Sequence, residues 1–273
     1  TDGTGATSTV TVTVQVAPPL ESAMDQRSTT IAVTVQEMYF FTQAETDLAL
    51  DMLKAAGVTN IRILLPWMGV EPLDDAWSWA AVDRMVNGAY SRDIEILAVL
   101  NSPPVWASVP DVPLLAGRPA SVAEFAEFAS MVTTRYAGKI SAYEIWNEQN
   151  YWGFWAPGPN AAQYTELLKA AYPAIKAADP DAVVLVGGLA SVLDFFVITA
   201  NPVRFVEEMY AAGAAGYFDA IAFHPYLYGM KFSAGANTAQ APLWQLNQIY
   251  ALMVANGDGN KKIWATEYGQ PSH

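Results

Sequence analysis

Residues 94–101 read IEILAVLN, residues 122–136 read VAEFAEFASMVTTRY, and residues 142–146 read AYEIW. The first and third stretches are short, nearly continuous apolar runs, which are typical of strands buried on both faces. The middle stretch follows the capping box Ser121-x-x-Glu124, and its apolar residues recur at helical spacing. A buried strand, a helix and a second buried strand in succession predict a parallel sheet covered by helices.

The same alternation continues in both directions, from about residue 29 to the end of the chain. The predicted strands are residues 31–35, 60–67, 94–101, 142–146, 182–186, 220–223 and 262–266, and the predicted helices are residues 43–56, 80–90, 122–136, 161–177, 203–212 and 242–255. An open doubly wound sheet and a closed (β/α)8 TIM barrel both fit this pattern. No Gly-x-Gly-x-x-Gly motif follows the first strand, which favours the barrel. We therefore expect an α/β fold, a (β/α)8 TIM barrel over residues 21–273 that lacks its eighth βα unit.

The amino-terminal residues follow a different pattern. Residues 9–16 read TVTVTVQV, a two-residue alternation expected of a half-buried antiparallel strand. A lone strand is not stable, so residues 1–20 are interpreted as a β-strand tail or linker. Residues 2–16 resemble the last strand of the immunoglobulin-like repeats of large bacterial surface proteins. This resemblance implies a covalently linked upstream domain and a secreted or cell-surface location.

The composition excludes several classes of function. The chain of 273 residues has 14 basic and 27 acidic residues, and its net charge of −13 disfavours nucleic acid and membrane surfaces as partners. Cysteine is absent, so disulfides, thiol nucleophiles and thiolate metal sites are excluded. The only histidines are His224 and His273, too few for a three-histidine zinc site. We expect no cofactor, no catalytic metal and no transmembrane helix.

Two glutamates stand at the carboxyl ends of predicted strands. Glu148 ends the fourth strand, and Glu267 ends the seventh. The carboxyl ends of the strands form the catalytic face of such barrels, and the fourth and seventh strands lie across the mouth from one another. A single glutamate at a strand end is as often merely exposed to solvent as it is catalytic. Two of them, each flanked by aromatic and small polar residues, indicate a catalytic pair.

The surrounding motifs resemble those of clan A glycoside hydrolases. Residues 146–148, Trp-Asn-Glu, are similar to the acid/base motif of the clan, and residues 264–269, WATEYG, are similar to its nucleophile motif. Residues 223–226, FHPY, and Arg62 in the second strand also match clan positions. Residues 103–108, PPVWAS, resemble a segment of family 39 and its relatives. The resemblance extends over roughly residues 29–269.

The resemblance implies a retaining mechanism with Glu148 as acid/base and Glu267 as nucleophile, whose carboxyl groups lie about 5–5.5 Å apart. It also implies that Asn147 contacts the sugar 2-hydroxyl. We expect Arg62 and Tyr226 to donate hydrogen bonds that keep Glu267 ionised. The alternative for Arg62 is a buried ion pair that closes the barrel, and the alternative for Tyr226 is simple packing.

One histidine and four tryptophans complete the predicted site. His224, at the tip of the sixth strand, is either a site residue or a core histidine with satisfied hydrogen bonds. Trp152 and Trp155 lie in an aromatic-rich stretch directly after Glu148, and flat aromatic faces suit the apolar faces of sugar rings. The alternative is a loop that folds on itself. The remaining candidates for lining the site, at the ends of the second and third strands, are Trp67 and Trp106.

These features favour a retaining β-glycoside hydrolase that acts on a polysaccharide or a glycoside. One alternative is a non-catalytic carbohydrate-binding barrel or adhesin module, although a binding protein would be free to lose the catalytic residues. A transglycosylase that uses the same residues is another alternative. The missing eighth unit would leave two barrel edges unpaired, so we expect lost stability or a borrowed strand such as residues 9–16.

Overall fold

A computed structural model of the chain describes residues 32–113, 115–229 and 231–269. The interpretation of residues 1–20 as a remnant of an upstream domain, and of residues 9–16 as a strand, lies outside these residues. No helix in the described part is long and apolar enough to cross a membrane.

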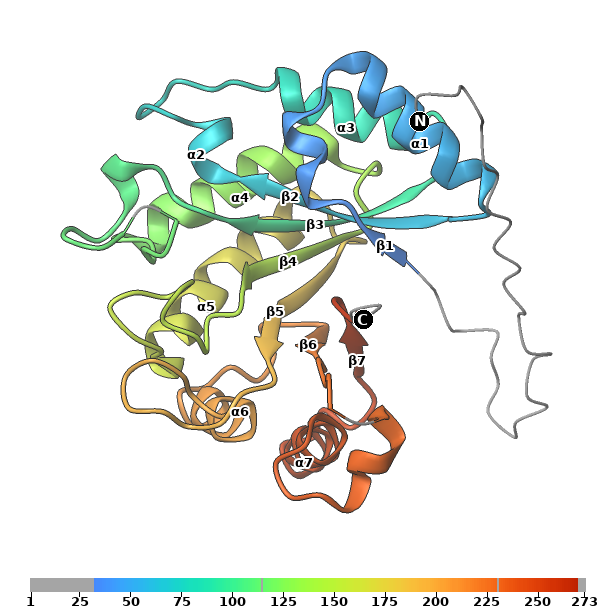
Figure 1. Cartoon of the computed structure of the whole chain (residues 1–273). Coiled ribbons are helices and arrows are strands. Elements are labelled where there is room, and N and C mark those ends of the chain that lie inside the picture. Colours follow the sequence, from blue (N-terminus) through green and yellow to red (C-terminus); the bar gives the residue numbers. More distant parts are fainter. Residues whose placement is uncertain (1–31, 114, 230, 270–273) are drawn as a thin grey trace, which may run out of the picture. The chain divides into compact units, whose positions relative to one another are not determined.

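Seven parallel strands form one sheet whose spatial order follows the sequence (Figure 1). The strands are β1 (Ala32–Thr34), β2 (Asn60–Pro66), β3 (Glu95–Asn101), β4 (Ala142–Asn147), β5 (Val183–Ala190), β6 (Ala220–His224) and β7 (Lys262–Ala265). The sheet curls into an incomplete barrel of the (β/α)8 type, and the strands β1 and β7 are its two edges. The predicted α/β barrel with seven strands is thus confirmed.

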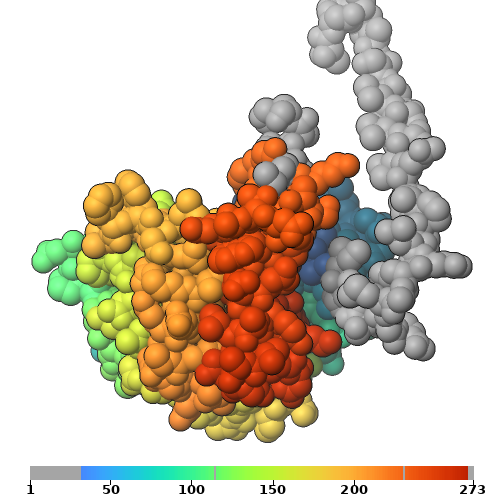
Figure 2. All heavy atoms as spheres, turned by 90° about the horizontal axis from the view of Figure 1, so that it is seen from below, coloured from blue at the N-terminus to red at the C-terminus, as the bar shows by residue number. Residues whose placement is uncertain are grey.

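Helices follow the strands in the predicted alternation. The main helices are α1 (Gln43–Ala55), α3 (Ala80–Tyr90), α4 (Val122–Tyr136), α5 (Ala161–Ala178), α6 (Pro202–Ala211) and α7 (Pro242–Ala255). Short helical turns add α2 (Trp67–Val70), η2 (Gln36–Phe40), η3 (Val105–Ala107) and η4 (Phe232–Asn237), which the sequence pattern does not predict. Figure 2 shows the face of the molecule that the carboxyl-terminal half of the chain forms. On this face, α7 lies beside α6.

Two apolar layers hold the barrel together. The larger one lies between the sheet and the helices, where Phe125 and Phe128 of α4 pack against Trp67. The smaller one fills the inside of the curled sheet and includes Ala142 of β4 and Leu185 of β5. Residues in register on neighbouring parallel strands point to the same side of a sheet. The residues of the smaller layer therefore identify which of their neighbours also face the barrel interior.

The two edges of the sheet approach one another at their carboxyl ends. The Thr34 hydroxyl of β1 donates a hydrogen bond of 3.4 Å to the backbone oxygen of Thr266, which directly follows β7. The loops that follow β2, β3 and β4 lie on the side to which these strands' arrowheads point (Figure 1). The incomplete barrel therefore still brings the ends of β1, β2, β4, β6 and β7 to a common mouth.

Candidate active site

A buried ion pair forms the floor of this mouth. Arg62 of β2 and Glu144 of β4 are both almost wholly buried. Arg62 Nε lies 2.8 Å from Glu144 Oε2, and Arg62 Nη2 lies 3.1 Å from Glu144 Oε1. Glu144 Oε1 also accepts a hydrogen bond from the backbone N–H of Gly188. Such a bidentate pair, with its remaining lone pairs satisfied, fixes the plane of the guanidinium group.

The same guanidinium group reaches two predicted site residues. Arg62 Nη1 lies 2.7 Å from Glu267 Oε1, and Arg62 Nη2 donates to Asn147 Oδ1 at 2.9 Å. Burial disfavours the charged form of Arg62, but the negative charges of Glu144 and Glu267 outweigh burial and raise its pKa. Arg62 is therefore both the barrel-closing ion pair and the donor to Glu267, two roles that the sequence alone presents as alternatives.

Glu267 receives two further hydrogen bonds. The hydroxyl of Tyr226 donates to Glu267 Oε2 at 3.0 Å, and the side-chain amide of Gln36 donates to Glu267 Oε1 at 3.3 Å. Burial and the negative charge of Glu267 raise the pKa of Tyr226, so its hydroxyl keeps the proton that it donates. Three donors thus converge on the carboxylate of Glu267.

Glu148 contacts the imidazole of His224. His224 Nδ1 lies 3.0 Å from Glu148 Oε1, and His224 Nε2 lies 3.1 Å from the hydroxyl of Thr266. His224 is fully buried, and both ring nitrogens have a partner. The imidazole therefore connects the end of β4 to the residue before Glu267, which places His224 in the site as well as in the core.

The two glutamates face one another across His224. One carboxylate oxygen of each glutamate and one nitrogen of His224 all lie within 4.8 Å of one another. Carboxylates and imidazole are common ligands of divalent cations, so these three residues form one of two groups among the described residues that could hold a metal ion; the other is Glu71, Asp74 and Asp75. The guanidinium group of Arg62 already supplies a positive charge beside Glu267.

An unusual backbone conformation turns Asn147 into the mouth. Trp146 has a φ of 79° and Glu148 a φ of 48°, in the left-handed region that side chains other than glycine rarely adopt. Ile145 and Trp146 both pack in the layer between sheet and helices, whereas Asn147 contacts Arg62 inside the mouth. The reversal at Trp146 breaks the strand alternation, and strained residues of this kind concentrate at functional sites.

A glycine in β5 makes room for the histidine. A Cβ atom built on Gly188 would overlap the imidazole ring of His224. The backbone oxygen of Gly188 also accepts a hydrogen bond of 2.8 Å from the backbone N–H of Glu148. Gly188 therefore fixes the backbone at Glu148 and leaves room for the His224 ring that contacts the Glu148 carboxyl group.

The predicted aromatic residues divide into two groups. Trp152 is 36% exposed and Trp106 is partly exposed, so both have surface available at the mouth side of the barrel. Trp67 is the first residue of α2 and stacks on Phe128 in the core. Trp155 is buried beside Trp146 and Tyr164. Other side chains cover the rings of Trp67 and Trp155, so neither presents an open face to a sugar. The structure therefore differs from the expectation that these two residues line the site.

The sequence pattern does not predict two further polar residues of the mouth. Gln36 lies in the helical turn after β1, where no periodic pattern marks it. Asn101 ends β3, pairs in register with Pro66, and shares the inward face of Leu97 four residues before it. Its Oδ1 atom is buried without a hydrogen-bond partner among the described residues. Its place at a strand end was the available signal.

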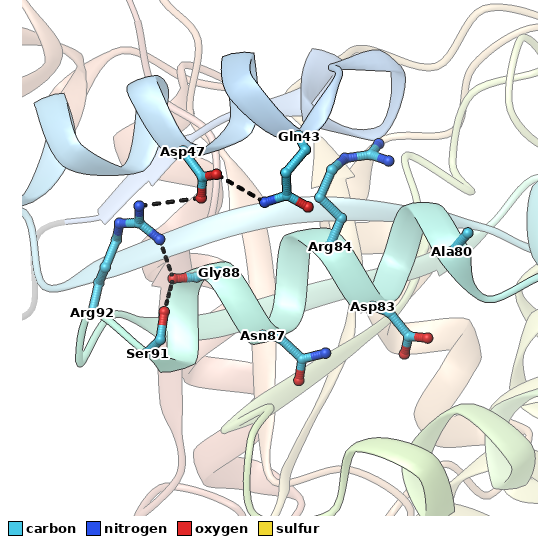
Figure 3. A pocket seen from close by; sticks show the side chains of 9 residues that line it. All are labelled: Gln43, Asp47, Ala80, Asp83, Arg84, Asn87, Gly88, Ser91 and Arg92. Carbon is cyan, nitrogen blue, oxygen red and sulfur yellow. Dashed lines mark hydrogen bonds and ion pairs between the residues drawn. The ribbon is translucent and has the colours of Figure 1, made fainter.

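A surface depression lies away from this mouth. It is lined by residues of α1 and α3 and by the residues that follow α3, and Asp47, Arg92 and Gly88 are connected in it by hydrogen bonds (Figure 3). Each of its charged groups has a polar partner: Arg92 pairs with Asp47, whereas Asp83 pairs with Arg135 and Arg84 donates to the Thr46 hydroxyl. Because it holds neither of the strand-end glutamates, the candidate active site is the mouth and not this depression.

The sequence matches a known family of enzymes over most of its length. Residues 24–273 match the family described as Cellulase (glycosyl hydrolase family 5). No curated protein sequence matches the chain.

Solved structures of glycoside hydrolases share the fold. A family 39 glycoside hydrolase from the gut symbiont Bacteroides cellulosilyticus WH2 is 22% identical with a TM-score of 0.68, and covers 88% of this chain and 49% of its own. The GH39 enzyme from Xanthomonas axonopodis pv. citri is 18% identical with a TM-score of 0.63, and covers 88% and 51%. A GH10 endoxylanase from a sugarcane soil metagenome is 16% identical with a TM-score of 0.58, and covers 88% and 66%. The chain thus spans about half the length of the two family 39 structures.

Proposed function

The chain belongs to the cellulase family, glycosyl hydrolase family 5, and from this premise we propose that it is a retaining β-glycoside hydrolase that cleaves a polysaccharide or a glycoside. The observation that carries the proposal is the facing pair Glu148 and Glu267, with carboxylate oxygens within 4.8 Å of one another. Retaining enzymes hold their carboxyl groups about 5–5.5 Å apart, whereas inverting enzymes leave about 6.5–9.5 Å for a water molecule. The limit of 4.8 Å joins one oxygen of each carboxylate, and so close an approach favours the shorter of these two separations.

The hydrogen bonds support a different role for each glutamate. Glu267 accepts from Arg62, Tyr226 and Gln36, all of which stabilise a carboxylate, as a nucleophile requires. Glu148 has one side-chain partner among the described residues, a nitrogen of His224. Its carboxyl group thus has fewer side-chain partners than that of Glu267 and is free to contact the leaving oxygen, as the acid/base must.

In the first step, an oxygen of Glu267 attacks the anomeric carbon of the sugar. Glu148 donates its proton to the glycosidic oxygen as the bond from the anomeric carbon to that oxygen breaks. The leaving group departs as an alcohol, and the sugar remains bound to Glu267 as an ester. The amide oxygen of Asn147 accepts from Arg62, which also contacts Glu267, and we expect this amide to contact the 2-hydroxyl of the sugar.

In the second step, Glu148 is ionised and accepts a proton from a water molecule. The water oxygen attacks the anomeric carbon, the ester bond to Glu267 breaks, and Glu267 returns to its carboxylate form. Glu148 ends protonated and Glu267 ends ionised, as at the start. Two inversions at the anomeric carbon give a product with the original configuration.

Reducing-end release across β-linked glucans, mannans, xylans and bacterial exopolysaccharides tests this proposal, with Glu267→Gln as the matched variant. We expect release from at least one polymer and its loss in Glu267→Gln. Proton NMR of the first product formed then gives its anomeric configuration. A β-product from a β-linked substrate supports the retaining mechanism, and an α-product contradicts it. If a polymer binds but no polymer in the panel is cleaved, the carbohydrate-binding alternative is favoured.

A further inference from the structure

An exposed apolar loop borders the mouth between β5 and α6. Four consecutive residues in it, Phe195, Phe196, Val197 and Ile198, are 55%, 89%, 69% and 39% exposed. Trp152, in the loop after β4, lies against them, since its backbone N–H donates to Ile198 O at 2.7 Å. We call these five residues the apolar rim. Contiguous exposed apolar residues on a soluble protein mark sites of interaction.

The loop is fastened by its own hydrogen bonds, so the exposure of the apolar rim is a defined feature of the fold. The backbone of Phe195 pairs with that of Thr199, and the Thr199 hydroxyl donates to Leu193 O. Asp194 accepts from the backbone N–H of Asn201 at 2.9 Å and forms an ion pair with Arg204. These contacts close a short hairpin whose tip carries the most exposed residues.

The base of this loop is attached to the chain segment that carries Glu148. The buried side chain of Asn150 donates to Ala190 O and Ala200 O, both at 2.9 Å, and accepts from the Ala190 N–H at 2.8 Å. The backbone oxygen of Asn150 also accepts from the Ala200 N–H. Asn150 thus joins both ends of the loop, two residues beyond Glu148. The loop that carries the apolar rim is therefore tied to the chain segment directly after Glu148.

The proposed direction of proton transfer indicates on which side of the mouth the leaving group lies. If Glu148 is the acid, the leaving group lies on the side of Glu148, whereas the sugar that is transferred lies over Glu267. On the basis of the function proposed above, we propose that the apolar rim is the binding site for the leaving group and that it takes an aglycone with an apolar body, such as an alkyl or aryl group.

The chemistry of the rim favours such an aglycone over a further sugar ring. A sugar needs hydrogen-bond partners for its hydroxyl groups as well as an apolar surface for one face. Among the five rim residues only Trp152 carries a polar side-chain group, its indole N–H, and Val197 and Ile198 are aliphatic. Aliphatic side chains gain from contact with any apolar surface removed from water, without a preference for hydroxyl-bearing rings.

The test compares leaving groups on a common sugar. The probes are ethyl and octyl β-glucosides, β-xylosides and β-mannosides, used below the concentration at which the octyl glycosides form micelles. For the sugar that is cleaved, kcat/KM for the octyl glycoside should exceed that for the ethyl glycoside by about tenfold or more, because the additional methylene groups leave water. The ratio is informative since the sugar and the catalytic groups stay the same.

Two variants locate the effect. Phe196→Gln should lower the octyl-to-ethyl ratio about threefold or more, because Phe196 is the most exposed residue of the rim. Met52→Gln makes a comparable change at a 64% exposed position of α1, outside the mouth, and should leave the ratio unchanged. A ratio near one in the unsubstituted protein, or a ratio that Phe196→Gln does not alter, overturns the inference while leaving the hydrolase intact.

A binding measurement separates this inference from the proposed function. If no glycoside is hydrolysed, isothermal titration calorimetry with the octyl glycosides still reports on the rim. Weaker binding to Phe196→Gln than to Met52→Gln would then support the apolar binding site although the proposed function fails. Equal binding to both variants, or no binding to either, would overturn the inference as well.

Discussion

At the scale of single residues, the two glutamates differ in the number of donors that hold them. Glu267 accepts from Arg62, Tyr226 and Gln36, whereas Glu148 contacts His224. For a substrate with a reactive leaving group, such as a dinitrophenyl glycoside, the first step needs no proton from Glu148. We therefore expect Glu148→Gln to release a burst of dinitrophenol and then turn over slowly, about 10²- to 10⁴-fold below the original rate.

Glu267→Gln is the control for this experiment. It should show neither the burst nor the turnover, because the group that forms the ester is absent. Stopped-flow absorbance of dinitrophenol measures both phases. A burst in Glu267→Gln that is missing in Glu148→Gln would show that the two roles are reversed.

Tyr226 gives a prediction about pH. Its hydrogen bond of 3.0 Å to Glu267 is made to a charged group, and loss of such a bond costs about 1.5–3 kcal/mol, so Tyr226→Phe should lower kcat/KM roughly 10- to 150-fold. Burial and the charge of Glu267 raise the pKa of Tyr226, so the hydroxyl remains protonated at pH values where a free tyrosine ionises.

Any loss of activity below about pH 10, the pKa of a free tyrosine, therefore comes from another group. The alkaline limb of the kcat/KM profile should fall at the same pH in the original protein and in Tyr226→Phe. If the limb disappears in Tyr226→Phe, Tyr226 is the group that titrates, and the role assigned to its hydroxyl is wrong.

The sequence predicted the residues of the site better than their orientations. Arg62, His224 and Tyr226 lie where their strand positions indicated, because the ends of parallel strands meet at one edge. The inward turn of Asn147 depends on the left-handed conformation of Trp146. Strand alternation alone would have assigned Trp146 to the same face as Glu144 and placed Asn147 on the other. Local strain of this kind has no signature in the residue pattern.

At the scale of secondary-structure elements, the strand β5 has a glycine where the imidazole of His224 packs against it. A Cβ atom on Gly188 would overlap that ring. Gly188→Ala should therefore displace His224 from Glu148, destabilise the fold by about 1–3 kcal/mol, and reduce activity. Urea unfolding and glycoside hydrolysis measure the two effects.

Gly229 provides a matched control for this substitution. Its φ lies outside the left-handed region, and a Cβ atom added to it would have no neighbour within 4 Å among the described residues. Gly229→Ala should leave stability within about 0.5 kcal/mol of the original value. Equal stability and activity of Gly188→Ala and Gly229→Ala would show that the space at Gly188 is not needed.

The helices α3 and α4 are joined by a group that makes stability depend on pH. Asp83 of α3 accepts from Arg135 at 2.6 and 2.9 Å and from the Tyr136 hydroxyl at 2.9 Å. The hydrogen bonds from Arg135 hold the pKa of Asp83 below its usual value. Because the pKa of Asp83 is lower in the folded than in the unfolded state, this group stabilises the fold above the unfolded-state pKa of about 4. That stability is lost as the pH falls through the folded-state pKa.

Asp83→Asn removes the titrating group. It should cost about 1 kcal/mol of unfolding free energy at pH 7 and less at pH 3, so the two proteins converge in acid. Urea unfolding at both pH values measures the difference. A difference that stays constant between pH 7 and pH 3 would contradict this assignment.

The periodic elements were predictable, and the irregular ones were not. All seven strands and the six long helices overlap their predicted ranges, because buried strands and amphipathic helices carry periods that the sequence displays. The turn α2 begins directly after Pro66 and buries Trp67, and four residues are too few to show a helical period. The loop between β5 and α6 owes its shape to contacts from Asn150, which are distant in sequence.

At the scale of the whole molecule, the sheet leaves two edges whose covering helices are incompletely buried. α1 exposes Leu48 and Met52, one helical turn apart, at 61% and 64%. α7 likewise exposes Tyr250 and Val254, one turn apart, at 46% and 53%. Within the described residues, β1 and β7 each pair with a strand on one side only, so these apolar stripes and open edges are surfaces on which a second molecule can pack.

The net charge of −13 opposes such packing. Like charges repel at low ionic strength, and salt screens them within about 8–10 Å near physiological concentrations, whereas contact between apolar surfaces is not weakened. Self-association of this chain should therefore increase with protein concentration and with added sodium chloride. An association driven by ion pairs would decrease with salt instead, so light scattering at increasing salt distinguishes the two causes. Leu48→Gln with Val254→Gln leaves the charge unchanged and should reduce association at every salt concentration, because it removes apolar surface from both ends of the sheet without touching the mouth.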